Sequence, residues 1–247
     1  MTMKQLYFFS YLITCLSISA FSQEFDSDHN NSTAIKFAPA SLWAGKVTLG
    51  GEYNFANRKS FTLVVGIPFE KSQKLTIDGK QSDLVSKAFS VMGGYRYYLN
   101  KNTMSGFYVE PYAKYVKHEA KGLIPFDLNG QAIIMDNYSE YSGFGVGAQI
   151  GLQAVIAKTV IFDLFLLGPE ANSSKFSSRS TDITNNAGWD QADADDAELT
   201  IENILSDIPI VGDKIDVTVD TDKRSVFTRF SGFVPGFRIG ASVGIRF

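Results

Sequence analysis

The chain is poor in the residues that most catalytic and cross-linking chemistry needs. It has one cysteine, Cys15, and two histidines, His29 and His118. Cys15 lies in an apolar N-terminal stretch, so we expect no disulfide in the rest of the chain. No later stretch approaches the roughly 20 apolar residues of a membrane helix. Catalysis through a histidine base therefore has few candidate residues.

The N-terminus has the pattern of an export signal. Lys4 precedes an apolar stretch over 6–20, and Ala20-Phe21-Ser22 supplies small residues at the usual cleavage spacing. We expect residues 1–22 to be a signal peptide and 23–247 to form one domain. A lipid-modified Cys15 is the alternative, and it is disfavoured because Thr14 precedes the cysteine where a smaller residue is usual.

The net charge of −3 conceals an uneven distribution. Between Asp182 and Asp222 there are twelve acidic residues and one base, which leaves fourteen acids and twenty-two bases elsewhere. An acidic insertion on an otherwise basic body argues against nucleic-acid binding. We expect no nucleic-acid partner.

The last stretch of the chain alternates strictly between two kinds of residue. Every second residue from Phe237 to Phe247 is apolar, and the residues between them, from Arg238 to Arg246, are charged, hydroxylated or glycine. This period of two predicts a strand with one apolar and one polar face. The chain stops on an apolar aromatic residue, which is typical of the closing strand of an outer-membrane barrel.

The same alternation recurs along the chain. It predicts strands near 33–42, 46–55, 61–69, 89–99, 107–115, 143–156, 160–166 and 237–247. Connections after the second, fourth and sixth strands are short, and those over 70–85, 117–141 and 168–232 are long, as in outer-membrane barrels. We predict an all-β protein, an eight-stranded antiparallel transmembrane β-barrel. Its insertion over 168–232, between strands seven and eight, should be extracellular and hold a helix (190–208) and a β-hairpin (215–230).

Aromatic residues on the apolar faces gather at both ends of the predicted strands. At the periplasmic ends they are Phe55, Phe61, Tyr97, Phe107, Phe162 and Phe247, and at the outer ends Phe69, Phe89, Tyr115, Phe144 and Phe237. Two such girdles are expected at the two levels of lipid headgroups. A soluble lipocalin-like barrel would also alternate, but with its apolar face inward.

Several runs resemble a family of outer-membrane β-barrels common in Bacteroidota to which no activity is assigned. They are KFAPASL (36–42), GKVTLGGEY (45–53), GYRYYL (94–99), GFYVEPYAKY (106–115) and GFRIGASVGIRF (236–247). The resemblance implies an OmpA/OmpX-like barrel in the bacterial outer membrane, assembled by the barrel-assembly machinery through its C-terminal strand. It implies no activity. The acidic insertion is larger than such barrels usually carry.

Charged residues on the polar faces should meet inside the barrel. They are Glu52, Arg96, Glu110, Lys114, Asp163, Arg238 and Arg246. Because an eight-stranded barrel has room only for its own side chains, we expect a packed ionic network that plugs the lumen. A narrow, gated ion path is the alternative.

The remaining candidate sites are weaker. Asp193, Asp195 and Asp196 lack the glycine and glutamate spacing of an EF-hand, so we expect a solvated helix start and no metal or cofactor. His118 could pair with a serine of the next predicted strand, Ser139 or Ser142, but no nucleophile motif surrounds it. We predict a non-catalytic outer-membrane protein with a structural role or with surface binding of a protein or ligand through 168–232. A lipid-modifying enzyme is the alternative.

Overall fold

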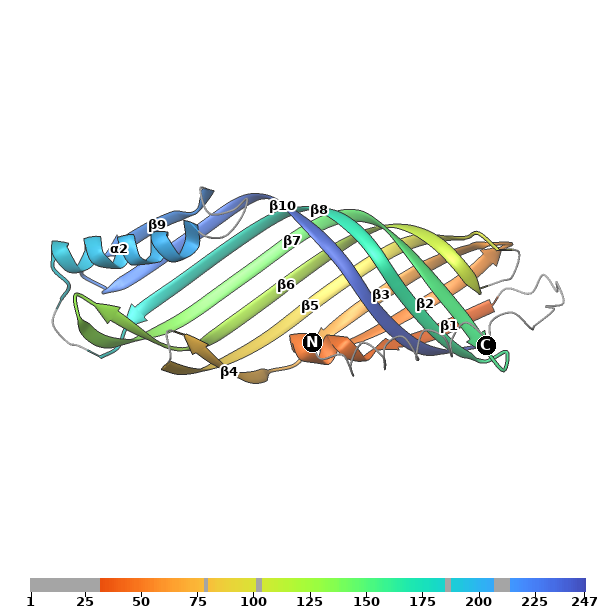
Figure 1. Ribbon diagram of the computed structural model, residues 1–247, viewed down its shortest axis with the longest axis horizontal. Coiled ribbons are helices and arrows are strands. Elements are labelled where there is room, and N and C mark those ends of the chain that lie inside the picture. Colours follow the sequence, from red (N-terminus) through yellow and green to blue (C-terminus); the bar gives the residue numbers. More distant parts are fainter. Residues whose placement is uncertain (1–31, 78–79, 101–103, 185–187, 207–213) are drawn as a thin grey trace, which may run out of the picture.

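The computed structural model describes residues 32–77, 80–100, 104–184, 188–206 and 214–247, and Figure 1 shows an elongated closed sheet. Eight strands form the ring: β1 (Ser32–Ala38), β2 (Lys46–Ala56), β3 (Lys59–Pro68), β5 (Lys80–Tyr98), β6 (Gly106–Leu128), β7 (Gln131–Ile156), β8 (Val160–Asp182) and β10 (Ser225–Arg246). Each is antiparallel to its neighbours in chain order. The predicted eight-stranded antiparallel barrel is confirmed.

The first and last strands close the ring. β1 pairs with β10 from Ala34↔Arg246 to Phe37↔Val243. Beyond these pairs, the Phe247 amide donates to the carbonyl oxygen of Thr33 at 2.8 Å. Closure removes the free edges at which a sheet exposes unpaired backbone groups. The predicted first strand was too long, because Pro39–Ala44 forms a 3-10 turn, η1, after β1.

The apolar faces of the strands point outward and the charged faces point inward. Phe237, Val243 and Phe247 are 59%, 39% and 72% exposed, whereas Arg96 is 4% and Glu110 0% exposed. A lipocalin-like barrel would show the opposite distribution. The structure therefore excludes that alternative.

Two predicted long loops are strands. The predicted 117–141 loop is wrong, because β6 and β7 continue as a paired ladder to a turn at Asn129-Gly130. The predicted 70–85 loop is also wrong: β4 (Lys71–Ile77) pairs with the extended start of β5. Both segments mix polar and apolar residues without a regular period of two, so the hydrophobic alternation that marks a strand is lost there.

The predicted insertion was too wide. Residues 168–182 continue β8 and residues 225–232 belong to β10, where Ser225 pairs with Thr181. The insertion proper narrows to 183–224 and contains α2 (Gln191–Ser206) and β9 (Asp216–Asp220). β9 forms a hairpin with β10, as in the pair Val217↔Thr228. The helix and hairpin are confirmed, except that the predicted helix end at Ile208 lies outside the described residues.

The elements divide into two ends. α2 and β9 lie at one end of the barrel, which we call the α2 end, and Phe247 lies at the other, which we call the short-turn end (Figure 1). The proposed signal peptide, 1–22, lies outside the described residues. No helix in the described part of the chain is long and apolar enough to cross a membrane.

Candidate functional site

The centre of the barrel interior holds an ionic core of Lys36, Glu52, Arg96, Glu110 and Asp163. Arg96 reaches all three carboxylates. Its Nη2 lies 2.7 Å from Glu110 Oε2, and its Nη1 lies 2.8 Å from Asp163 Oδ2 and 3.3 Å from Glu52 Oε2. These residues come from β1, β2, β5, β6 and β8, so the core links strands around the ring.

Lys36 is a member of the core that sequence reasoning missed. Its Nζ lies 2.5 Å from Glu52 Oε2 and 2.8 Å from Asp163 Oδ2. The predicted first strand, 33–42, includes Lys36, and Ile35 and Phe37 flank it in an ordinary alternation. This alternation places Lys36 on the inner face, so the sequence could have predicted it as a member of the ionic core.

Neutral donors complete the hydrogen bonding of the three carboxylates. Tyr98 donates to Glu52 Oε1 and Tyr108 donates to Asp163 Oδ1, each at 2.6 Å. Gln149 donates to Glu110 Oε2 at 2.8 Å, and Thr62 also donates to Glu110. Buried charges are tolerated when they are paired and fully hydrogen-bonded in this way.

Glycines on the inner face of β7 make room for the long side chains opposite. A Cβ on Gly147 would lie 2.7 Å from Tyr112 Oη, and one on Gly151 would collide with the Tyr108 ring. Both tyrosines lie on β6, the neighbouring strand. The glycines therefore let β6 fill the interior with its tyrosines.

A second ion pair lies further toward the α2 end. Lys114 pairs with Glu170, which also accepts a hydrogen bond from Tyr112 at 2.8 Å. Sequence reasoning included Lys114 and missed Glu170. The reason is that residues 168–232 were predicted to form the insertion, whereas β8 continues to Asp182. A register shift between Ile150 and Gly151 in the β7–β8 pairing also changes which residues of β8 face inward after Leu167.

The other two predicted lumen residues lie away from the ionic core. The Arg238 guanidinium lies 4.5 Å from the centre of the Phe165 ring and 5.5 Å from that of Tyr112, and it contacts the sulfur of Met92. Arg246 lies near the short-turn end, where its Nη2 donates to Ser32 Oγ at 3.2 Å. Neither forms a salt bridge with a core carboxylate in the described part of the chain.

Apolar side chains cover the ionic core on its short-turn side. They are Ala34, Tyr98, Met104, Tyr108 and Ile161, and all are fully buried. The Met104 carbonyl accepts a hydrogen bond from Gln153 at 2.8 Å. Met104 lies just before β6, so its side chain helps to close the short-turn end.

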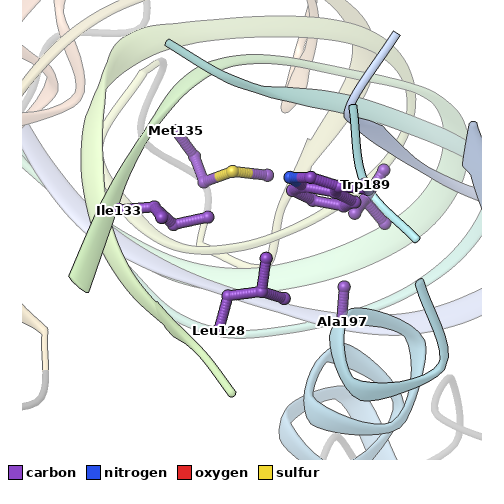
Figure 2. Close-up of a cluster of buried hydrophobic side chains, with 6 residues drawn as sticks. Leu128, Ile133, Met135, Trp189 and Ala197 are labelled. Atoms are coloured by element: carbon purple, nitrogen blue, oxygen red, sulfur yellow. The ribbon is translucent and has the colours of Figure 1, made fainter. Parts of the chain in front are cut away.

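A larger apolar cluster closes the α2 end, and we call it the lid cluster. Its buried members are Leu128, Ile133, Met135, Trp189, Ala197 and Val226. Figure 2 shows Met135 and Trp189 directed toward one another, with Ala197 on α2 beside Leu128. Trp189 also donates to Asp182 Oδ2 at 3.2 Å. The insertion therefore packs its apolar residues onto the strand ends.

The acidic start of α2 is attached to the β6–β7 turn. The Asn129 amide donates to Asp196 Oδ2 at 3.0 Å, and its side chain donates to Asp193 Oδ1 at 2.9 Å. Asp195 accepts from Gln191 at 2.8 Å. Two of the three aspartates considered for calcium thus hold the lid to the neighbouring turn.

Outward-facing charges form a chain beyond Tyr115. Lys117 lies 3.3 Å from Glu119 and 3.1 Å from Glu140, and Lys87 lies 2.9 Å from Glu119. The hydrogen bond from Lys87 is the main cause that lowers the pKa of Glu119. The hydrogen bond to Glu140 is the main cause that raises the pKa of Lys117.

The predicted girdle residues face outward. Ten of the eleven are among the exposed large side chains, namely Phe61, Phe69, Phe89, Tyr97, Phe107, Tyr115, Phe144, Phe162, Phe237 and Phe247. Phe55 is half-buried because its ring stacks on Phe61, with centroids 4.6 Å apart. Tyr115 and Phe144 are direct partners across β6 and β7.

His118 does not meet a serine. It lies opposite Tyr141 in the β6–β7 ladder, with ring centroids 6.2 Å apart. Ser139 is paired with Ala120 and donates to Asn137, and Ser142 is paired with Lys117. No hydrogen bond joins His118 to a serine among the described residues.

Comparisons with known proteins add little. No family model matches the chain, and no curated protein matches it. The chain is similar to the crystal structure of CarO from Acinetobacter baumannii, with a TM-score of 0.37 and 12% identity over 91% of this chain and 99% of that chain. A likeness this slight carries no argument about family or activity. The resemblance to Bacteroidota barrels stays a prediction.

Proposed function

We propose that this protein is a non-catalytic β-barrel of the bacterial outer membrane that stabilises the envelope or binds a surface ligand through its α2 end. The supporting observation is an outward apolar band between two aromatic sets on a closed barrel with an ionic interior. In lipid, only closed barrels and helices can satisfy all backbone groups. Soluble monomeric proteins rarely expose a contiguous apolar surface as large as this band.

The height of the band suits an outer membrane. Phe237 on β10 and Phe247, the residue after its end, are ten residues apart, which is about 33 Å along an extended chain at ~3.3 Å per residue. A strand tilted by ~40° then spans about 25 Å, the height of the apolar band in such barrels.

The aromatic set nearer the α2 end also follows the tilt of the strands. Tyr115 pairs with Phe144, but the residue of β5 opposite Tyr115 is Val91, and Phe89 lies two residues further on. In a tilted barrel, residues at one membrane level must shift along the strands from one strand to the next. Phe89 shows such a shift relative to Tyr115, whereas Tyr115 and Phe144 are directly opposite.

The two ends of the barrel determine the proposed orientation. Outer-membrane barrels have short periplasmic turns and long outer loops. The turns after β2 and β7 are short, Asn57-Arg58 and Ala157-Lys158-Thr159, while α2 and β9 lie at the opposite end. We therefore assign the α2 end to the cell surface, and the short-turn end to the periplasm.

The outer part stands well clear of the proposed membrane. Leu128 lies thirteen residues beyond Tyr115 on β6, which corresponds to a rise of about 30 Å at ~3.3 Å per residue and ~40° tilt. Exposed apolar residues at this end include Ile134 and Leu199. A rigid extension that carries such residues is suited to contact with an extracellular protein or ligand, as proposed for this end.

The ionic core supports a plug in preference to a pore. Arg96, Glu52 and Glu110 are almost fully buried, and they are linked directly across the interior. Ion flow would require these buried pairs to open, which is costly. The pore alternative predicts single-channel conductance that changes in Glu110→Gln, whereas the plug predicts no conductance in either protein.

We also propose that the barrel-assembly machinery recognises β10, and that outer-membrane lipid surrounds the apolar band. β10 carries an outward apolar run and closes the ring with β1. The enzyme alternative predicts loss of a lipid acyl modification in His118→Ala. The proposal predicts no change in the lipids, because the imidazole has no nucleophile beside it.

A depth series of lysine substitutions tests the membrane assignment. Val243→Lys, near the middle of the band, should destabilise the folded barrel by about 2–4 kcal/mol, whereas Phe237→Lys, at its edge, should cost about 0–1 kcal/mol. The measurement is urea titration in lipid vesicles, followed by the gel mobility of the folded form. Equal costs at the two positions, or solubility of the mature chain without detergent, would refute the assignment.

A deletion tests the surface role separately. A chain in which a short Gly-Ser turn replaces 183–224 should still insert, because the ionic core and all eight ring strands remain. Loss of ligand binding without loss of insertion supports the surface role. Failure to insert would show that the segment is needed for assembly.

A further inference from the structure

Inward cations outnumber inward carboxylates on the side of the ionic core nearer the α2 end. The ionic core holds three carboxylates, Glu52, Glu110 and Asp163, and two cations, Lys36 and Arg96, while Glu170 next to it is paired with Lys114. Two further cations, Lys46 and Arg238, point into the same region, so five cations face four carboxylates there and one positive charge is in excess. No carboxylate forms a salt bridge with either of them within the described ranges.

The contacts of these two cations are neutral. Lys46 Nζ donates to Ser90 Oγ at 3.1 Å. Arg238 lies against the Phe165 and Tyr112 rings. Lys46 is also within electrostatic range of Arg238 and Lys114, so positive charges accumulate there. A cation enclosed by protein and lipid is costly unless a counter-charge accompanies it.

A cavity of about 50 Å³ lies beside Arg238. Its lining includes Arg238, Arg96, Lys36, Thr48, Ser242 and Gln149. Three of these side chains are cationic. Asp163 also lines the cavity, but its carboxylate is already paired with Lys36 and Arg96. A volume of this size holds a monatomic ion or one to two water molecules.

An unsatisfied hydroxyl supplies an independent sign of a ligand. Thr48 is 8% exposed, lines the cavity, and its Oγ1 has no hydrogen-bond partner. Buried polar atoms are almost always paired, so an orphaned hydroxyl indicates an unseen partner. Gln149 Oε1 is also unpartnered and marks the side of the cavity that an anion must avoid. The favourable position lies between Arg238 and Thr48.

We propose that this cavity is a binding site for a halide-sized inorganic anion, held by the Arg238 guanidinium and the Thr48 hydroxyl, with Lys46 as a nearby positive charge. The anion supplies the counter-charge that the carboxylates of the interior do not provide. The site stabilises the barrel and does not depend on the proposed surface role.

The first test uses the full mature chain in detergent, with bromide as the probe. Crystals grown in bromide should show an anomalous peak in the cavity, within contact distance of Arg238 and Thr48. A cavity that contains only water, with no anomalous peak at saturating bromide, would overturn the proposal.

The second test measures stability as gluconate is replaced by chloride at constant ionic strength. The unfolding equilibrium constant should fall about tenfold when chloride exceeds its Kd about ninefold, and then follow a saturation curve. Thr48→Val should abolish this saturable effect with little change of shape, and Arg238→Met should do the same if it folds. Lys175→Met, which removes an exposed cation of β8, should keep it. An equal chloride effect in Thr48→Val and in the parent would also overturn the proposal.

Discussion

Removal of Arg96 is the sharpest test of the ionic core. Arg96 is 4% exposed and is within salt-bridge distance of three carboxylates. Arg96→Met keeps a similar apolar volume and deletes the guanidinium. Glu110 then keeps only the neutral donors Gln149 and Thr62, while Glu52 and Asp163 share Lys36.

The expected cost is large because three buried negative charges then face one positive charge. Breaking a buried ion pair by removing one partner costs about 3–5 kcal/mol. At ~1.4 kcal/mol per tenfold, this corresponds to a rise of roughly two to three and a half orders of magnitude in the unfolding equilibrium constant. Adding Glu110→Gln to Arg96→Met removes the most isolated carboxylate, and should recover about 1–3 kcal/mol of the loss.

Urea titration in lipid vesicles measures these differences, with the folded fraction read from gel mobility. Lys175→Met on the outer face of β8 serves as the matched control, because it removes one exposed cation and should change the midpoint little. The reasoning fails if Arg96→Met is no more destabilising than this control. It also fails if the double substitution is worse than Arg96→Met alone.

Three further outcomes follow from other parts of the structure. Gly147→Leu should block folding because its side chain would occupy the place of a tyrosine, whereas Gly93→Ala, with open space around it, should fold normally on a heat-modifiability gel. Trp189→Ala should open the lid cluster and expose 183–224 to protease while the barrel stays resistant, and Leu199→Ala on the exposed face of α2 should not. Hydrogen bonds from Lys87 and Lys117 lower the pKa of Glu119, so ionised Glu119 stabilises the folded state above its ordinary pKa of 4.5, and this stabilisation is lost as the pH falls through the lowered pKa. In Glu119→Gln, the free energy of unfolding should lose this pH dependence.

The sequence predicts most of the barrel because one rule governs all eight ring strands. Where one face meets an apolar medium and the other a packed polar interior, residues must alternate, and the alternation is visible from Val47 to Phe55 or from Phe237 to Phe247. The rule fails beyond the apolar band, where each face of a strand mixes polar and apolar residues. The parts of β6 and β7 nearer the α2 end were therefore predicted as a loop, although the two strands stay paired up to their connecting turn.

The interior was predictable in composition and not in detail. Alternation places Glu52, Arg96 and Glu110 inside, but it cannot say which charges meet, because pairing depends on the register between strands. Glu170 illustrates the limit: it lies in the segment predicted as insertion, and a register shift in the β7–β8 pairing reverses which residues of β8 face inward there. Lys36 was different, since its own strand held the necessary alternation.

Three layers of side chains fill the interior, which explains how the barrel can extend beyond the apolar band and still be filled along its length. Apolar side chains cover the short-turn side, the ionic core links five strands at the centre, and the lid cluster covers the α2 end. The core links strands that lie within the proposed membrane, whereas the lid links strands that rise above it. Since the strands above the band are no longer supported by lipid, α2 is needed to hold their ends together. On this argument, Trp189→Ala should loosen the outer extension and leave the urea midpoint of the membrane-embedded part unchanged.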